Sequence, residues 1–190
     1  MTHTKNEDLV ELLVTDHREV EEMFGLLEKI SGVASDEART LAERVVIELV
    51  RHSVAEEAYL YPTVRARVPD GEALADREIA EHAEAEKVMK KLEKLEPADA
   101  EFWPTLQTLM ADIRHHVAEE EHELFPKLRQ AVPEDLLAEL GDKARLAKKV
   151  APTRPHPSAP DSPPWNKILA PGAGLVDRLR DALSGRGKPS

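Results

Sequence analysis

Two stretches of the sequence decide the fold: Arg51-His52-Ser53-Val54-Ala55-Glu56-Glu57-Ala58-Tyr59-Leu60-Tyr61-Pro62 and Arg114-His115-His116-Val117-Ala118-Glu119-Glu120-Glu121-His122-Glu123-Leu124-Phe125-Pro126. Each places a histidine four residues before a glutamate and ten residues before a proline. Side chains four residues apart lie on one face of an α-helix, about 6 Å apart along its axis. An imidazole and a carboxylate in this arrangement can bind a metal ion, so two such pairs on facing helices predict a site for two ions.

The two stretches belong to an internal repeat with an offset of 64 or 65 residues. His17 and His82 are 65 residues apart, and each follows an acidic residue, Asp16 or Glu81. Apolar residues around these positions recur at spacings of three and four, which is the pattern of amphipathic helices. A duplicated helical hairpin of this kind closes into a four-helix bundle, whose inward side chains surround a shared centre.

The predicted fold class is all-α: an up-down-up-down four-helix bundle with a short fifth helix and a disordered C-terminal tail. The expected helices cover about residues 8–30, 35–62, 71–96, 99–126 and 133–149. Pro62 and Pro126 should kink or end their helices near the next turn, because proline lacks the backbone N–H and clashes with the preceding turn.

The chain is expected to divide into a bundle domain and a tail. Residues 1–150 contain all the long periodic segments and should form the domain. Within residues 151–190 lie eight of the fourteen prolines and four of the eight glycines, a composition typical of a flexible linker. One short amphipathic helix is expected near the end of this tail, at about residues 175–183.

Charge and composition exclude several classes of protein. The net charge is −11, and residues 151–190 carry +3, so residues 1–150 carry −14. So acidic a domain repels nucleic acid and anionic membranes. The chain has no cysteine, which excludes disulfides, thiolate metal sites and cysteine nucleophiles. The first eight residues lack the apolar core of a signal peptide, and no apolar run approaches the roughly 20 residues that span a bilayer. We therefore expect a soluble cytoplasmic protein.

Six polar side chains occupy positions where the helix periodicity demands apolar residues. They are His17, His52, His82 and His116, one on each helix, together with Glu56 and Glu120. A glutamate is almost never fully buried without a partner, because desolvation of a carboxylate is costly. Four histidines and two glutamates in one acidic core therefore predict a bound cation. A single core histidine is usually a hydrogen-bonding group, and His115 and His122 fit chance surface pairs, so the metal prediction rests on the repeated set.

The ligand chemistry narrows the choice of metal without deciding it. Imidazole and carboxylate without thiolate suit iron, manganese or zinc. Carboxylates on facing helices can bridge, which favours a centre with two ions. The spacing does not separate iron from manganese.

The ordered series resembles the hemerythrin-like family, also known as the HHE cation-binding domain family, and the resemblance covers about residues 8–130. The residues that carry it are His17, His52-x-x-x-Glu56, His82 and His116-x-x-x-Glu120. The resemblance implies two iron ions joined by an oxo or hydroxo bridge, with Glu56 and Glu120 bridging them and the four histidines as terminal ligands. It also implies that the centre binds small molecules such as dioxygen, hydrogen peroxide or nitric oxide.

Two further positions have more than one interpretation. Oxygen-carrying hemerythrins typically have a second histidine four residues after the one on the third helix, and this chain has Glu86 there, either an additional ligand or a solvated residue. The spacing from His116 to Glu120 is also shorter than is usual in those proteins. Tyr59, three residues after Glu56, either approaches the metal or packs in the core.

Three classes of function remain open at this stage. The first is a protein that stores, carries or senses dioxygen, nitric oxide or iron, for example in oxidative or nitrosative stress. The second is a catalase-like enzyme that decomposes peroxide, with Glu86 or Tyr59 as proton donors. The third is a helical interaction module without metal, which would leave the four histidines unexplained. Because the extra histidine of the oxygen carriers is missing, the handling or sensing of oxidants is favoured over transport.

Overall fold

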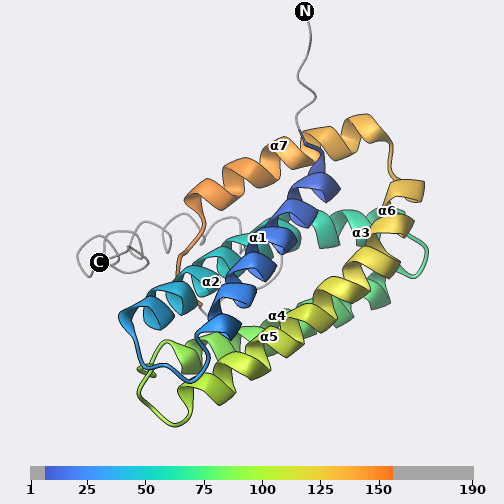
Figure 1. Ribbon diagram of the computed structural model, residues 1–190. Coiled ribbons are helices and arrows are strands. Elements are labelled where there is room, and N and C mark those ends of the chain that lie inside the picture. Colours follow the sequence, from blue (N-terminus) through green and yellow to red (C-terminus); the bar gives the residue numbers. More distant parts are fainter. Residues whose placement is uncertain (1–6, 156–190) are drawn as a thin grey trace, which may run out of the picture.

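The computed structural model describes residues 7–155, and every regular element in that range is a helix, as predicted (Figure 1). The elements are α1 (Leu9–Lys29), α2 (Asp36–Ala55), η1 (Glu56–Leu60), α3 (Tyr61–Arg67), α4 (Gly71–Leu92), α5 (Phe102–Glu119), η2 (Glu120–Leu124), α6 (Phe125–Ala131) and α7 (Glu134–Val150). α2, η1 and α3 follow one another without a break, as do α5, η2 and α6. These two long helices form a four-helix bundle with α1 and α4.

The helices pair as the repeat predicts. α1 packs against α2, α4 packs against α5, and α7 lies along the outer side of α1 and α2 (Figure 1). The buried apolar side chains form two clusters, one with Leu13 and Leu124 and the other with Val20 and Ile113. In α1, His17 lies between Leu13 of the first cluster and Val20 of the second. The bundle therefore holds a polar layer between two apolar clusters.

Local sequence signals determine where the helices begin. Asp8 caps α1 by accepting a hydrogen bond from the Glu11 backbone, and the Glu11 side chain accepts one from the Asp8 backbone. Arg129 on α6 pairs with the same Asp8 carboxylate, with 2.8 Å between Nη1 and Oδ2. Ser35 caps α2 through its hydroxyl oxygen. The contact between Asp8 and Arg129 ties the start of the bundle to its end.

Pro62 lies in the first turn of α3, and the helix ends near the next turn, at Arg67, as the sequence predicts. Just before the proline, the five residues Glu56–Leu60 form a π-helix, in which the Tyr61 N–H donates to the Glu56 carbonyl. The wider turn relieves the clash between the proline ring and the carbonyl four residues earlier. The second half repeats this arrangement before Pro126. The extra residue in the turn changes which side chains face the bundle centre.

Residues 151–155 leave α7 and pack against the bundle. Ala151 and Thr153 are buried, and Arg154 Nη1 lies 3.3 Å from Oε1 of Glu93, the residue that follows α4. The sequence predicts a flexible tail from residue 151, whereas its first five residues are packed. The rest of that prediction, with the short helix near the end of the chain, lies outside the described residues. None of the described helices combines the length and the apolar character needed to cross a membrane.

α7 approaches the start of α1 through Gly141. A Cβ atom at this position would lie 2.7 Å from the Glu7 carbonyl oxygen and 2.9 Å from the Leu9 backbone nitrogen. We predict that Gly141→Ala lowers the free energy of unfolding by about 1–3 kcal/mol, the usual cost of overpacking, as measured by urea denaturation. Gly25→Ala is the control, because no atom lies within 4 Å of its Cβ, and it should stabilise the protein by about 0.5–1 kcal/mol. Equal stability of Gly141→Ala and the original protein would contradict the close packing of α7.

Candidate metal centre

The four histidines meet in two pairs in the middle of the bundle. The Nε2 atoms of His17 on α1 and His52 on α2 are 3.2 Å apart, and those of His82 on α4 and His116 on α5 are also 3.2 Å apart. All four side chains are buried. Each half of the repeat therefore supplies one pair of imidazoles.

Glu56 lies between the two pairs. Its Oε1 is 2.9 Å from His52 Nε2, and its Oε2 is 3.2 Å from His82 Nε2. The residue is fully buried, and neither oxygen receives a hydrogen bond from the described part of the chain. A carboxylate that contacts one histidine of each pair has the position of a ligand that bridges two ions.

Glu120 has the equivalent position in the second half of the repeat. Its Oε2 lies 3.5 Å from His17 Nε2 and 3.8 Å from His116 Nε2. Its Oε1 accepts a hydrogen bond of 3.2 Å from the Tyr61 hydroxyl, which also lies 3.1 Å from His82 Nε2. Glu120 thus also spans the two pairs, and Tyr61 holds it in place.

The outer nitrogen of every histidine contacts a carboxylate. The four Nδ1 contacts are His17 with Glu121 at 2.9 Å, His52 with Asp16 at 3.2 Å, His82 with Glu57 at 3.1 Å and His116 with Glu81 at 3.0 Å. A carboxylate accepts a hydrogen bond from Nδ1 only when that nitrogen carries the proton. In the neutral imidazole, the Nε2 lone pair then points to the centre, and metal-binding histidines have the same arrangement.

When all four imidazoles are neutral, their inner nitrogens and the facing Glu56 oxygens are all acceptors. Neutral Nε2 atoms 3.2 Å apart direct lone pairs at each other and at the Glu56 oxygens. Both Glu56 oxygens and Oε2 of Glu120 lack a hydrogen-bond donor within the described residues. Buried acceptors without donors cost free energy. A cation between them satisfies all of these atoms at once, so the residues fit a metal site built from nitrogen and oxygen ligands.

The comparisons with known proteins agree with this donor set. The family model "Hemerythrin HHE cation binding domain" matches residues 8–128. The chain belongs to this hemerythrin family. An uncharacterised hemerythrin-like protein of Schizosaccharomyces pombe is 29% identical over 169 residues, which cover 88% of this chain and 82% of that protein. A DNA nickase of a Nostoc species is 24% identical over 146 residues, covering 74% of this chain and 39% of the nickase.

A solved structure also shares the hemerythrin-like fold. It is the crystal structure of a hemerythrin HHE cation-binding domain-containing protein from Mycobacterium kansasii, with a TM-score of 0.63 and 23% identity. The match covers 75% of this chain and 86% of that chain. At this level of identity the similarity shows the fold alone.

The structure gathers the six side chains that the sequence singles out in the hemerythrin-like core. His17, His52, Glu56 and Glu120 form one group of potential ligand atoms within 4.8 Å of one another, and Glu56, His82 and His116 form a second. Glu56 belongs to both groups, as expected for a bridging carboxylate. Each group offers at least three potential ligand atoms for a cation, and a third buried group joins Glu78 to His116 and Glu120.

The two additional candidates are not among the ligand groups found in the described residues. Glu86 is half-buried on α4 and contributes no oxygen to these groups, and Tyr59 packs against the apolar cluster that contains Leu13. Sequence reasoning missed Tyr61, because in an α-helix the residue three positions after Glu56 shares its face. Because of the π-turn, the residue that shares the face of Glu56 is Tyr61, five positions later.

The outer carboxylates were also missed, although the sequence contains a signal for them. An acidic residue precedes the histidine at both 17 and 82, as Asp16 and Glu81, and a second glutamate, Glu57 or Glu121, follows each bridging glutamate. These residues recur at the same offsets as the histidines. The repeat therefore preserves the groups that orient the imidazoles together with the imidazoles themselves.

The buried carboxylates strongly perturb the ionisation of the histidines. Burial alone lowers the pKa of His52, but the Glu56 and Asp16 carboxylates together outweigh burial and raise the pKa to about 10. At His82, Glu56 and Glu57 together outweigh burial and raise the pKa to about 9. The two imidazoles hold the pKa of Glu56 well below its usual range against the effect of burial, whereas burial and the Glu56 charge raise the pKa of Glu120. Protons therefore compete with a metal for these ligands.

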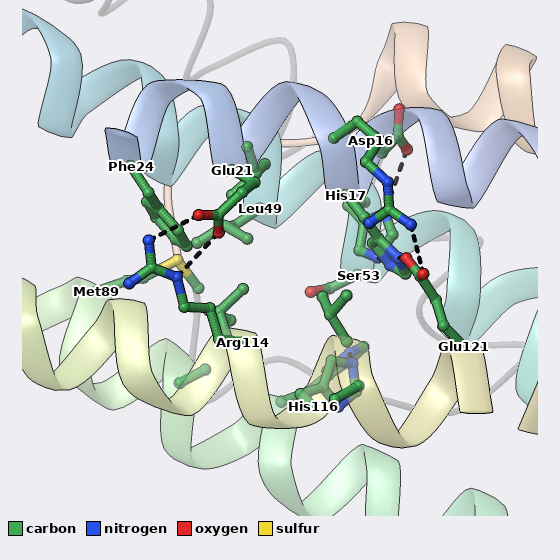
Figure 2. Close-up of a pocket in the computed structure, with 18 of the residues that line it drawn as sticks. Asp16, His17, Glu21, Phe24, Leu49, Ser53, Met89, Arg114, His116 and Glu121 are labelled. Carbon is green, nitrogen blue, oxygen red and sulfur yellow. Dashed lines mark hydrogen bonds and ion pairs between the residues drawn. The ribbon is translucent and has the colours of Figure 1, made fainter. Parts of the chain in front are cut away.

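A chamber of about 420 Å³ opens onto the four histidines (Figure 2). Its apolar lining includes Val20, Phe24, Leu49, Met89 and Ile113. Arg114 pairs with Glu21 at 2.7 Å along this lining and lies over the Phe24 ring at 5.6 Å (Figure 2). The chamber therefore joins an apolar lining to the histidines of the hemerythrin-like centre.

Metal binding should release protons. Neutral pH lies below the raised pKa values of His52, His82 and His116, so these imidazoles carry an additional proton in the metal-free protein. A metal ligand needs an unprotonated Nε2. We predict the release of roughly two to three protons per chain on binding of ferrous iron at about pH 7.5, and weaker binding as the pH falls from about 9 to 7. Calorimetry in buffers of different ionisation enthalpy measures both quantities, with His115→Ala as the exposed-histidine control. An affinity independent of pH would contradict the raised pKa values.

Proposed function

We propose that the protein binds two iron ions between the histidine pairs and that a small oxidant, such as dioxygen, hydrogen peroxide or nitric oxide, reacts or binds there. The observation that supports this proposal is the convergence of four buried Nε2 atoms with two buried carboxylates, three of whose oxygens lack a hydrogen-bond donor among the described residues. The proposed ligands are His17, His52, His82 and His116, with Glu56 and Glu120 as bridges.

The donor set supports iron among the available metals. Imidazole and carboxylate ligands without sulfur suit iron, manganese and zinc. Only iron and manganese of these three change oxidation state readily, and an oxidant as ligand requires such a metal. When bound, iron would supply a redox-active Lewis acid with an open coordination position. The proposal places this position toward the chamber, because the outer sides of the imidazoles are occupied by carboxylates.

The residues around the centre have distinct roles in this proposal. The apolar walls of the chamber admit uncharged small molecules and exclude bulk water from the ligands. Arg18 pairs with Glu121, the outer partner of His17, and so links the outer surface to the orientation of that imidazole. We propose no nucleic-acid partner, despite the partial similarity to a nickase, because the acidic domain repels nucleic acid.

A second candidate function, the decomposition of peroxide to water and dioxygen, is supported by Tyr61. Its hydroxyl lies between Glu120 and His82. Burial and the Glu120 charge raise the pKa of this phenol well above 10, so it carries its proton at neutral pH. It is therefore a proton donor inside the centre, the role that the sequence assigned to Tyr59 or Glu86 in an enzyme.

The ligand assignment is tested by the metal content of variants. We predict that His52→Ala and Glu120→Ala each lose at least one iron ion per chain and remain helical, because the two apolar clusters do not depend on these residues. Plasma emission gives the iron content, and circular dichroism gives the helix content. His115→Ala is the control, because its side chain is 68% exposed.

Unchanged iron content in His52→Ala and Glu120→Ala would refute the site. Oxygen evolution from the iron-loaded protein on a peroxide challenge, reduced in Tyr61→Phe and unaffected in Tyr59→Phe, would select the enzyme over the binding protein. Stable iron without oxygen evolution would select a binding protein or sensor. Occupancy by manganese or zinc in place of iron would overturn the choice of metal alone.

A further inference from the structure

One buried carboxylate beside the centre has no counterpart in the first half of the repeat. Glu78 on α4 is fully buried, and its Oε2 lies 3.0 Å from His116 Nδ1. At the offset of 65 residues that relates His17 to His82, the first half has Leu13, which is fully buried in an apolar cluster. Glu78 therefore stands where the repeat has an apolar residue, which breaks the symmetry of the bundle next to a proposed metal ligand.

His116 Nδ1 faces two carboxylates with a single hydrogen. Glu81 Oε2 is 3.0 Å away and accepts the hydrogen bond. Glu78 Oε2 is equally close but receives no hydrogen bond from the described residues, whereas its Oε1 accepts one of 3.0 Å from Arg77. A fully buried carboxylate oxygen without a donor is costly. Positive charge on the other side of the imidazole offsets this cost.

In the first half of the repeat, the charges next to the equivalent histidine, His52, cancel. His52 Nδ1 contacts Asp16 Oδ2 at 3.2 Å, and the other Asp16 oxygen pairs with Lys148 of α7. The outer side of His52 therefore has one carboxylate and one ammonium group. The outer side of His116 has two carboxylates and one guanidinium group, so it carries one more negative charge than the outer side of His52.

We propose that Glu78 makes the two metal positions unequal, so that the position between His82 and His116 binds its cation more tightly and is filled first. This inference rests on the proposed function, since it presupposes that the six ligands hold two ions. A carboxylate that accepts a hydrogen bond from the outer nitrogen of a metal-binding imidazole makes the imidazole a stronger ligand. In metalloproteins such carboxylates are conserved nearly as well as the ligands. A second carboxylate on one imidazole adds negative charge close to a single position, and attraction between charges in a buried site is screened little.

The internal repeat supplies the substitution that tests this inference. Glu78→Leu gives the second half the residue of the first, and Arg77 keeps its pairing with Glu123 at 3.2 Å. Anaerobic calorimetric titration of the metal-free protein with ferrous iron should resolve two binding steps in the original protein. In Glu78→Leu the tighter step should weaken about 10–100-fold, the usual effect of removing an outer partner of a metal ligand, while the weaker step stays in place. The metal-free variant should unfold at the same or a higher temperature, because a leucine replaces a buried carboxylate.

A matched pair of charge removals separates a local effect from a change in net charge. Glu78→Gln removes one charge beside His116 and preserves the shape, and it serves where the leucine variant fails to fold. Glu84→Gln removes one charge from the exposed face of the same helix, where Glu84 pairs with Lys87. Selective weakening of the first step in Glu78→Gln and not in Glu84→Gln supports the inference.

Two outcomes overturn the inference without touching the proposed function. In the first, both Glu78 variants bind iron in two steps with the affinities of the original protein. In the second, Glu78→Gln and Glu84→Gln weaken both binding steps equally. Failure of the original protein to bind iron at all would overturn the proposed function as well. Loading with ⁵⁷Fe gives a second readout, because substoichiometric iron should produce one Mössbauer site in the original protein and a mixture of two in Glu78→Leu.

Discussion

The structure depends on one physical constraint: buried acceptors that face one another need a shared cation. The Nε2 atoms of the four histidines converge with the buried carboxylates of Glu56 and Glu120. Apart from the imidazoles, the Tyr61 hydroxyl is the one group among the described residues that donates a hydrogen bond to these carboxylates. The carboxylates behind each imidazole fix the orientation that directs the lone pairs inward. Protons meet this need in part, because the pKa values of His52 and His82 are raised, and the proposed metal ions would meet it fully. The rest of the fold holds these atoms at their short separations against mutual repulsion.

That support comes from three parts of the chain. The two apolar clusters lie on either side of the polar layer and pack the helices of the bundle together at both of its ends. The π-turns keep each bridging glutamate in the layer and still let the helix run on past a proline. α7 supplies Lys148, which holds Asp16 behind His52 and so connects the fifth helix to one ligand of the centre. A helix that looks peripheral in the bundle therefore acts on the orientation of a core imidazole.

Much of this arrangement could be predicted from the sequence, because it follows from periodicity and repetition. The helices, the six convergent side chains and the relation between the halves are all visible as spacings of three, four and 64 or 65 residues. Tyr61 could not be predicted, because its position depends on a π-turn, and helical spacing rules assume 3.6 residues per turn. Glu78 could not be recognised either, since in a chain rich in glutamates nothing in the sequence separates one buried carboxylate from its exposed neighbours. The packing of residues 151–155 depends on contacts with α4 that a proline-rich composition does not reveal.

The most direct test of the central claim is the position of the metal ions. Crystals of the iron-loaded protein, measured on both sides of the iron absorption edge, should show two anomalous peaks about 3.5–4 Å apart, the spacing of two-metal sites. One peak should lie against His17 and His52, the other against His82 and His116, and both should contact Glu56. A single peak, or peaks outside the layer between the two apolar clusters, would contradict the account.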